Sequence, residues 1–250
     1  DNIPPVVNCP LDVTETVELG TSSRQVFFDT PSVTDDSGIF SLVQASNQPG
    51  TSFPTGSTTV TYTYTDGSQN IASCSFTINI IAVDNIPPVV ICPVDVTQTV
   101  ELGTSSRQVF FDVPNVSDNS GSFSLVQASH QPGASFTTGS TTVTYTYADG
   151  SQNSASCSFV INIIAVDNTP PVIQNCPSQL SEEIGFGATS GVVAWPIVFA
   201  SDNSGQVQVS SRSRNNGDIF PLGTTAVTIE FSDPSGNTAL CSFTVTVTAQ

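Results

Sequence analysis

Cationic side chains are almost absent from the sequence. It contains no lysine, one histidine and four arginines, against 21 acidic residues, and its formal net charge is −17. Binding to the phosphates of nucleic acids and to anionic lipids depends on clustered lysine and arginine. The composition therefore argues against nucleic acid and anionic membrane surfaces as partners.

Long apolar runs and helical periodicity are missing as well. No apolar run approaches the roughly 20 residues that a membrane span needs, so we expect no membrane insertion of this segment. The apolar residues are mostly Val, Ile, Phe and Tyr set among Thr and Ser, which is typical of strands. The chain opens mid-pattern at Asp1 without a visible signal peptide, so we expect a mature fragment or an excised piece of a longer protein.

The residues needed for catalysis do not recur. His130 is the only histidine, and Asn47 stands at the matching place of the first copy described below. A Ser/His/Asp or Cys/His arrangement would therefore exist in one copy at most. We expect no enzymatic activity, and we interpret His130 as a tolerated surface substitution.

A repeat of 83 residues organises the chain. Asp1-Asn2-Ile3-Pro4-Pro5 returns at Asp84 and, with Thr169 in place of the isoleucine, at Asp167. Residues 1–83 and 84–166 match at 69 of 83 positions, and the last copy is divergent. The period is too long for solenoid repeats and suits small domains in series. We predict domains at 1–83, 84–166 and 167–250.

The six cysteines follow the repeat, with one early and one late cysteine per copy, 65 residues apart. A zinc site needs about four ligands, and two thiols per copy lack the others. We therefore predict one disulfide per copy and an extracellular or cell-surface location. Closing a loop of this length stabilises a small domain by about 4 kcal/mol. The predicted pairs are Cys9 with Cys74, Cys92 with Cys157, and Cys176 with Cys241.

Strict alternation of side chains marks two strands near the end of each copy. Residues 58–65 place Val60 and two tyrosines on one face, and the next strand places Cys74 and Ile80 on its core side, after a hairpin at 66–70. Earlier strands are expected at about 5–18, where proline breaks the strand, at 25–29 and at 40–46. A strand is also expected near Trp195 in the third copy, with its indole in the core. About seven short antiparallel strands per copy predict an all-β chain of three tandem immunoglobulin-like or fibronectin-III-like β-sandwiches, elongated along the array.

The motif set resembles the hyalin repeat, or HYR domain. The residues that carry the resemblance are Asp-Asn-x-Pro-Pro followed by Cys-Pro, then Ser-Asp-Asn-Ser-Gly at 201–205, Phe-Pro-Leu-Gly-Thr-Thr at 220–225 and Ser-Asp-Pro-Ser-Gly-Asn at 232–237. Trp195 is similar to the usual aromatic of that family, where the other copies carry Phe27-Phe28 and Phe110-Phe111. The resemblance covers essentially the whole chain. It implies an immunoglobulin-like sandwich, extracellular adhesion and no catalytic residues.

Acidic and amide residues are expected to gather at one pole of each sandwich. Immunoglobulin-like topology brings the N-terminal linker and two loops together there, and Ca²⁺ selects such sets of hard oxygen ligands. Turn chemistry alone is the competing interpretation, because Asp, Asn, Gly and Ser are also ordinary turn formers. The candidate calcium ligands are Asp1, Asp35, Asp36 and Asp66 in the first copy; Asp84, Asn85, Asp118, Asn119, Asp149, Ser151 and Asn153 in the second; and Asp167, Asn168, Asp202, Asn203, Asp233, Ser235 and Asn237 in the third.

Three functions remain open on the sequence. The first is a section of an extracellular adhesin or matrix array, a calcium-stiffened stalk with multivalent contacts to other copies or to cell-surface or matrix proteins and glycans. The second is a glycan- or protein-binding receptor fragment, with its site in the third copy, which departs from the others over residues 178–219. The third is a subunit of a self-assembling filament. Asn115-Val116-Ser117 is a sequon, but the first copy carries Ser32 in place of Asn115, so we interpret the sequon as a chance sequence and not as a selected glycosylation site.

Overall fold

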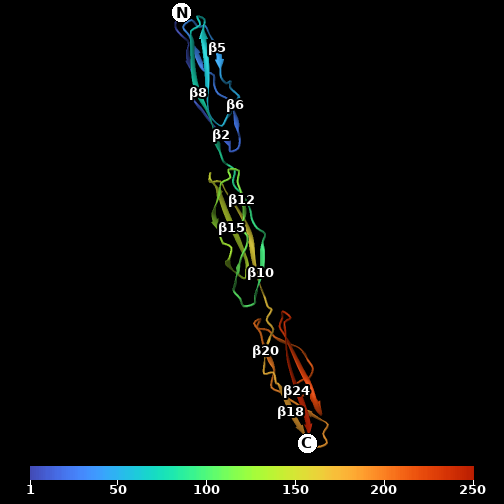
Figure 1. Ribbon diagram of the computed structural model, residues 1–250. Coiled ribbons are helices and arrows are strands. Elements are labelled where there is room, and N and C mark those ends of the chain that lie inside the picture. The colour runs from blue at the N-terminus through green and yellow to red at the C-terminus, as the bar shows by residue number, and fades with distance from the viewer. The chain divides into compact units, whose positions relative to one another are not determined.

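The computed structural model describes residues 1–250 and consists of strands, turns and loops (Figure 1). It holds no helix with the length and apolar character needed to cross a membrane. Each repeat contributes eight strands. In the first they are β1 (Val6–Asn8), β2 (Val13–Glu18), β3 (Ser23–Val26), β4 (Ser32–Thr34), β5 (Phe40–Ala45), β6 (Thr51–Pro54), β7 (Gly56–Asp66) and β8 (Ile71–Val83).

The other two repeats have the same element order. The second contains β9 (Val89–Ile91), β10 (Val96–Glu101), β11 (Ser106–Val109), β12 (Asn115–Ser117), β13 (Phe123–Ala128), β14 (Ala134–Thr137), β15 (Gly139–Asp149) and β16 (Ser154–Val166). The third contains β17 (Val172–Gln174), β18 (Gln179–Ile184), β19 (Ser190–Val192), β20 (Phe199–Ser201), β21 (Gln208–Arg212), β22 (Ile219–Pro221), β23 (Gly223–Ser232) and β24 (Thr238–Ala249).

Each repeat has one four-stranded sheet and two two-stranded sheets. In the first repeat the order of the large sheet is β2-β8-β7-β5, and the small sheets are β1-β4 and β3-β6. The second and third repeats have the same three sheets. The predicted all-β sandwich with one disulfide per repeat is thereby confirmed.

The density of contacts between Cα atoms divides the chain into two compact units, which do not coincide with the three sequence repeats. One unit comprises residues 1–93, 113–129 and 144–158, and the other comprises 94–112, 130–143 and 159–250.

Alternation in the sequence produces the core of the first repeat. Val60, Tyr62 and Tyr64 of β7 and Phe76, Ile78 and Ile80 of β8 are buried, together with Val26 and Phe53 of the small β3-β6 sheet. The threonines of β7 face outward, where the Thr61 and Thr63 hydroxyls each lie 2.9 Å from a serine hydroxyl of β8. Burial of such a stripe of large side chains is the main stabilising contribution to a domain of this size.

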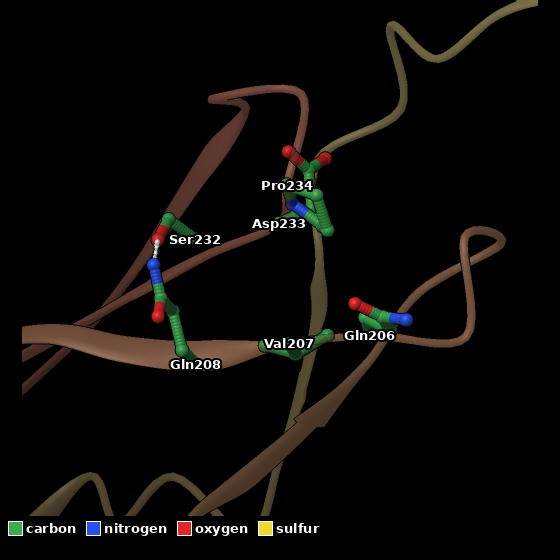
Figure 2. A pocket seen from close by; sticks show the side chains of 6 residues that line it. All are labelled: Gln206, Val207, Gln208, Ser232, Asp233 and Pro234. Carbon is green, nitrogen blue, oxygen red and sulfur yellow. Dashed lines mark hydrogen bonds between the residues drawn. The ribbon is translucent and has the colours of Figure 1, made fainter.

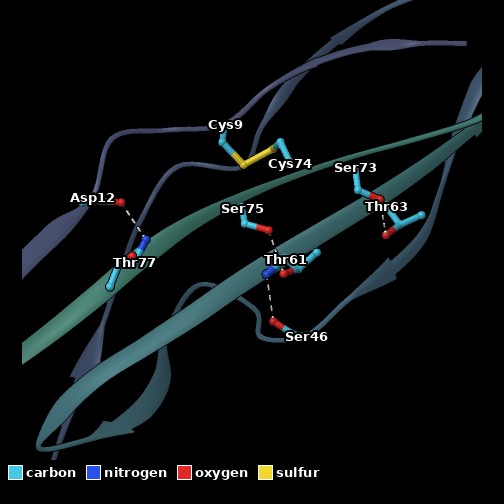
Figure 3. The surroundings of a disulfide bond; sticks show 9 residues. All are labelled: Cys9, Asp12, Ser46, Thr61, Thr63, Ser73, Cys74, Ser75 and Thr77. Atoms are coloured by element: carbon cyan, nitrogen blue, oxygen red, sulfur yellow. Dashed lines mark hydrogen bonds between the residues drawn. A yellow bond between two sulfur atoms is a disulfide. The ribbon is translucent and has the colours of Figure 1, made fainter.

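The disulfide of each repeat joins the start of the sandwich to its last strand. Cys9 follows β1 and bonds to Cys74 of β8 (Figure 3). Cys92–Cys157 and Cys176–Cys241 repeat this arrangement, and no cysteine is free. Next to the first disulfide, the backbone N–H of Thr77 donates a 2.7 Å hydrogen bond to Oδ1 of Asp12.

The opening strand expected at about 5–18 is broken at Pro10, as predicted, into β1 and β2. Three other expectations about strands were wrong in detail. β2 pairs with β8 in parallel, not antiparallel, because both strands point toward the end of the repeat. The strand expected at 25–29 ends at Val26, and Trp195 lies beyond the end of β19, outside any strand.

Candidate functional site

Three acidic residues meet at the start of the second repeat. Asp84 precedes β9, Asp118 lies in the turn after β12, and Asp149 is the last residue of β15. One carboxylate oxygen of each lies within 4.8 Å of the others. An equivalent cluster forms in the third repeat from Asp167, Asp202 and Asp233. The first repeat brings together Asp1, Asp35 and Asp36, and its third member stands at the position of Asn119. We call these three sets the acidic clusters.

The third carboxylate of the second cluster is fixed by its own turn. Oδ1 of Asp149 accepts 2.8 Å hydrogen bonds from the backbone N–H groups of Ser151 and Asn153. The Asn153 side-chain amide donates to Oδ2 of Asp149 at 2.7 Å and to the backbone carbonyl of Asp84 at 3.0 Å. Asn153 therefore attaches the segment containing Asp84 to the β15–β16 turn.

The other two carboxylates each have one satisfied oxygen. Oδ1 of Asp118 accepts the backbone N–H of Ser120 at 2.9 Å, a local turn contact. Oδ1 of Asp84 accepts the backbone N–H of Ile86 at 3.2 Å and the Asn119 amide at 3.1 Å. The turn chemistry expected from the sequence thus accounts for Oδ1 of both residues.

Oδ2 of Asp84 and Oδ2 of Asp118 are buried and have no hydrogen-bond partner. The equivalent Oδ2 atoms of Asp167 and Asp202 share this property, as does Oδ2 of Asp35. A buried carboxylate oxygen without a partner carries a large desolvation cost. The hydrogen bonds of the turns do not involve these Oδ2 atoms.

The cluster of the third repeat has the same contacts. Asp233 is 3% exposed, and its carboxylate accepts the Asn237 amide at 2.7 Å. The Asn237 amide also donates to the backbone carbonyl of Asp167 at 3.1 Å. Hydrogen bonds from the Ser204 side chain and then from its backbone N–H hold the pKa of Asp202 below its ordinary value.

In the first repeat, Asp66 occupies the position of Asp149. Burial by itself would raise the pKa of Asp66, but hydrogen bonds from the side chain and backbone of Asn70 and from the backbone of Ser68 outweigh this and lower the pKa. Asp1 is exposed in this cluster, whereas Asp84 and Asp167 are half-buried. The first cluster is therefore the most open of the three.

Asn85 and Asn168 bind partners other than the cluster carboxylates. The backbone and side-chain N–H groups of Asn85 donate to the Glu18 carboxylate at 3.2–3.3 Å. Asn168 contacts Glu101 in the same way, and its backbone hydrogen bond is the main reason that the pKa of Glu101 is lowered. Sequence reasoning missed both glutamates. The recurring Val-Glu-Leu-Gly at 17–20 and 100–103 was the available signal.

The geometry of the clusters fits a hard cation. Two oxygens on opposite sides of a Ca²⁺ ion, each about 2.4 Å from it, lie about 4.8 Å apart, and the carboxylate oxygens of each cluster lie within this limit of one another. Carboxylates without nitrogen or sulfur ligands are the donor set that Ca²⁺ prefers over transition metals. Backbone carbonyls and water would supply the remaining ligands.

A polar groove of about 300 Å³ lies beside the third cluster. Figure 2 shows Gln206, Val207 and Gln208 along one side and Ser232, Asp233 and Pro234 on the other. The Gln208 amide lies 3.4 Å from the Ser232 hydroxyl. The amide groups of Gln206 and Gln208 provide donors and acceptors for a hydroxylated ligand.

The remaining sequence candidates occupy varied environments. Trp195 is 7% exposed, and its ring centroid lies 5.2 Å from that of Phe243, so the expected core packing is confirmed. His130 is half-buried, as is Asn47 at the matching place of the first repeat, and its ring centroid lies 5.0 Å from that of Phe136. Asn115 begins β12 and is exposed.

Fold and disulfides together define a tandem array of stapled β-sandwiches of the kind found in extracellular proteins. The model of the HYR domain matches residues 1–80, 83–163 and 166–247. The chain belongs to the HYR domain family. HYR domains occur in extracellular adhesion proteins, and the chain is extracellular or at the cell surface.

Relatives with curated names cover the whole chain. It is 50% identical to hyalin of Strongylocentrotus purpuratus and 45% identical to hyalin of Lytechinus variegatus, in both cases over 99% of its own length. It spans 21% of the first protein and 47% of the second. A third relative is the sushi, von Willebrand factor type A, EGF and pentraxin domain-containing protein 1 of Rattus norvegicus, with 36% identity. That alignment covers 64% of this chain and 4% of the relative.

Solved structures show a weaker likeness. The chain aligns over its full length with the full length of mouse cadherin-23 EC22-24, with 14% sequence identity and a TM-score of 0.34. A likeness at this TM-score supports no argument about function.

Proposed function

We propose that the chain is a calcium-binding spacer within an extracellular adhesion or matrix protein, in which repeated sandwiches supply reach and many weak contacts. The single observation that supports it best is the recurrence of buried, unpartnered carboxylate oxygens in all three acidic clusters. The 69-of-83 identity of the first two repeats supports a role in which copy number matters. The family and the fold support a non-enzymatic role.

Electrostatics explain why a cation belongs in these clusters. The three carboxylates of each cluster repel one another. Burial strengthens this repulsion at two Oδ2 atoms in each of the second and third clusters and at one in the first. A divalent cation would neutralise most of this charge. Because Asp84 and Asp167 belong to the segments between repeats, the ion would also fix each segment to the sandwich that follows it.

Calorimetric titration of the chelator-treated chain with Ca²⁺ tests the proposal. We expect a dissociation constant between about 0.1 and 1 mM, the range of extracellular calcium modules. At a hundredfold excess of Ca²⁺ over this constant, the binding repeats gain about 2.7 kcal/mol of stability. An unchanged melting temperature between excess chelator and several millimolar Ca²⁺ would defeat the calcium part of the proposal.

Asp118→Asn with Asp202→Asn separates calcium binding from turn chemistry. Asparagine keeps the Oδ1 acceptor of the turn and loses the second anionic oxygen. In chelator, we expect the double variant to melt at or above the melting temperature of the wild-type chain, because repulsion between the carboxylates is reduced. We also expect it to lose most of the stability that Ca²⁺ adds to the wild-type chain. Glu183→Gln with Glu182→Gln is the matched control at two exposed carboxylates. It removes the same charge and should keep this added stability.

Glycan binding by the third repeat is a second candidate, favoured by the groove at Gln206, Gln208 and Asp233. A glycan array probed with the whole chain and with Gln206→Ala/Gln208→Ala tests it. We expect the variant to lose glycans that the wild-type chain retains. Equal retention by both proteins would remove this candidate and leave the spacer proposal intact.

A further inference from the structure

An exposed phenylalanine is held in place in each of the first two repeats. Phe27 is 74% exposed and Phe110 is 71% exposed. The Phe27 ring lies against Gly50, and a Cβ atom added to that glycine would come within 2.9 Å of the ring. At Gly133 the same distance to Phe110 is 3.0 Å. A glycine at this position therefore allows the backbone to support the ring.

The loop that supports the ring is itself well fixed. The Gly50 N–H donates to the carbonyl of Val26 at 2.7 Å, and its carbonyl accepts the Gln25 amide at 2.8 Å. Phe27 directly follows Val26, so the ring and its support belong to the same hydrogen-bonded unit. The exposed Phe27 ring, which lies against Gly50, contributes little to the core, which Phe28 fills by packing against Phe53 and Phe76.

A groove of about 530 Å³ contains this ring in the first repeat. Leu11, which is 88% exposed, lines it together with two carboxylates, Asp12 and Asp29. Asp12 is fixed by its hydrogen bond from Thr77 (Figure 3). The second repeat has the same residue types at Val94, Asp95, Phe110 and Asp112, and Oδ1 of Asp95 accepts the Val160 N–H at 2.7 Å.

In the third repeat these features are replaced together. Its sandwich is the same, with Trp195 at the place of Phe28. The fold therefore does not require the exposed ring or its carboxylates. The residues at the positions of Leu11, Asp12, Phe27 and Asp29 are Ser178, Gln179, Ala194 and Pro196.

We propose that the groove at Phe27, and the matching residues around Phe110 in the second repeat, each bind an arginine side chain from a basic segment of another protein. A guanidinium group is attracted to an aromatic face and to flanking carboxylates, and its stem packs on apolar side chains such as Leu11. The charge of −17 favours a basic partner and opposes a second copy of this chain.

The experiment uses the whole chain and a fluorescent peptide of four Gly-Arg units, with fluorescence anisotropy as the readout. A peptide with citrulline in place of arginine has nearly the same shape and no charge. We expect the arginine peptide to bind and the citrulline peptide to bind at least tenfold more weakly. Equal binding of the two peptides, or preference for the neutral sugar chitotetraose, would overturn the proposal.

Two pairs of variants separate the groove from general charge attraction. Phe27→Ala with Phe110→Ala should weaken arginine binding about threefold to tenfold, whereas Phe27→Tyr with Phe110→Tyr should retain it. Asp29→Asn with Asp112→Asn should weaken binding more than Glu182→Gln with Glu183→Gln, which changes the net charge equally. Full binding by the alanine pair, or equal loss from both carboxylate pairs, would show that only net charge matters and would overturn the proposal. The spacer proposal is tested by Ca²⁺ and is unaffected by either result.

Discussion

The Tyr62 hydroxyl donates a 3.2 Å hydrogen bond to the backbone carbonyl of Asn47. The equivalent hydroxyl of Tyr145 in the second repeat is buried and has no hydrogen-bond partner. Both rings are at most 1% exposed, and burial raises the pKa of both phenols. Two nearly identical repeats therefore differ in one buried polar contact, beside the position where Asn47 is replaced by His130.

Removal of the two hydroxyls should have opposite effects. Tyr62→Phe loses a satisfied hydrogen bond, and we expect the first repeat to lose about 1 kcal/mol. Tyr145→Phe removes an unsatisfied buried group, and we expect the second repeat to be unchanged or to gain up to about 1 kcal/mol. Hydrogen exchange measured on peptides that distinguish the repeats checks both values. Equal losses at the two positions would contradict the difference between the hydroxyls.

Local patterns in the sequence predict most of the sandwich. The alternation of Val60, Tyr62 and Tyr64 with threonines is enough to predict β7, since successive side chains of a strand point alternately to the core and to the solvent. The parallel pairing of β2 with β8 is not predictable in this way, because Val13 and Val17 present the same pattern in either direction. Strand direction depends on contacts far apart in the sequence.

The sequence predicted which acidic residues gather at the pole, but not which of their carboxylate oxygens are hydrogen-bonded. The sequence places Asp118 and Asp149 in turns, and the structure shows that Asp149 has both oxygens bonded while Asp118 keeps a buried unpartnered oxygen. Likewise, Phe27 and Phe28 are adjacent residues of the same type, and the sequence does not tell which of the two rings is buried. Only the three-dimensional position of Gly50 and Phe76 decides which ring is exposed and which is packed.

Asn237→Ala should destabilise the third repeat by about 2 kcal/mol. The side chain donates to the charged carboxylate of Asp233 and to the backbone carbonyl of Asp167, and hydrogen bonds to charged groups contribute about 1.5–3 kcal/mol. Urea unfolding followed by the fluorescence of Trp195, the only tryptophan, reports on this repeat alone. Thr246→Val, at an exposed hydroxyl pair, is the control and should change stability by less than about 0.5 kcal/mol. A loss as small as that of the control would contradict a bridging role for Asn237.

Acid should destabilise the third repeat in a defined pH window. The pKa of folded Asp202 is lowered, chiefly by the Ser204 side chain and then by its backbone N–H. A lowered folded pKa contributes stability that is fully present above the unfolded value of about 3.9 and is lost as the pH falls through the folded pKa. In chelator, the stability of the third repeat, measured by unfolding followed through Trp195 fluorescence, should be nearly constant between pH 7 and pH 5. It should decrease when the pH is lowered below about 4.

Ser204→Ala removes the leading cause of that shift. We expect its stability to depend less on pH below 4 than that of the wild-type chain, because the folded and unfolded pKa values of Asp202 move closer together. Titration of Trp195 fluorescence in both proteins provides the comparison. An identical acid dependence in the two proteins would show that other carboxylates control the acid transition.

Loss of one disulfide should weaken only its own repeat. Cys176 and Cys241 close a loop with a sequence separation of 65 residues, for which the chain-entropy model gives about 4 kcal/mol. We expect Cys176→Ala with Cys241→Ala to lower the stability reported by Trp195 by about this amount. Hydrogen exchange in residues 1–83 should stay at the wild-type rate, because we predict that this repeat folds as a separate domain. Faster exchange throughout residues 1–83 would show that the repeats unfold as one cooperative unit and would contradict the predicted domain boundaries.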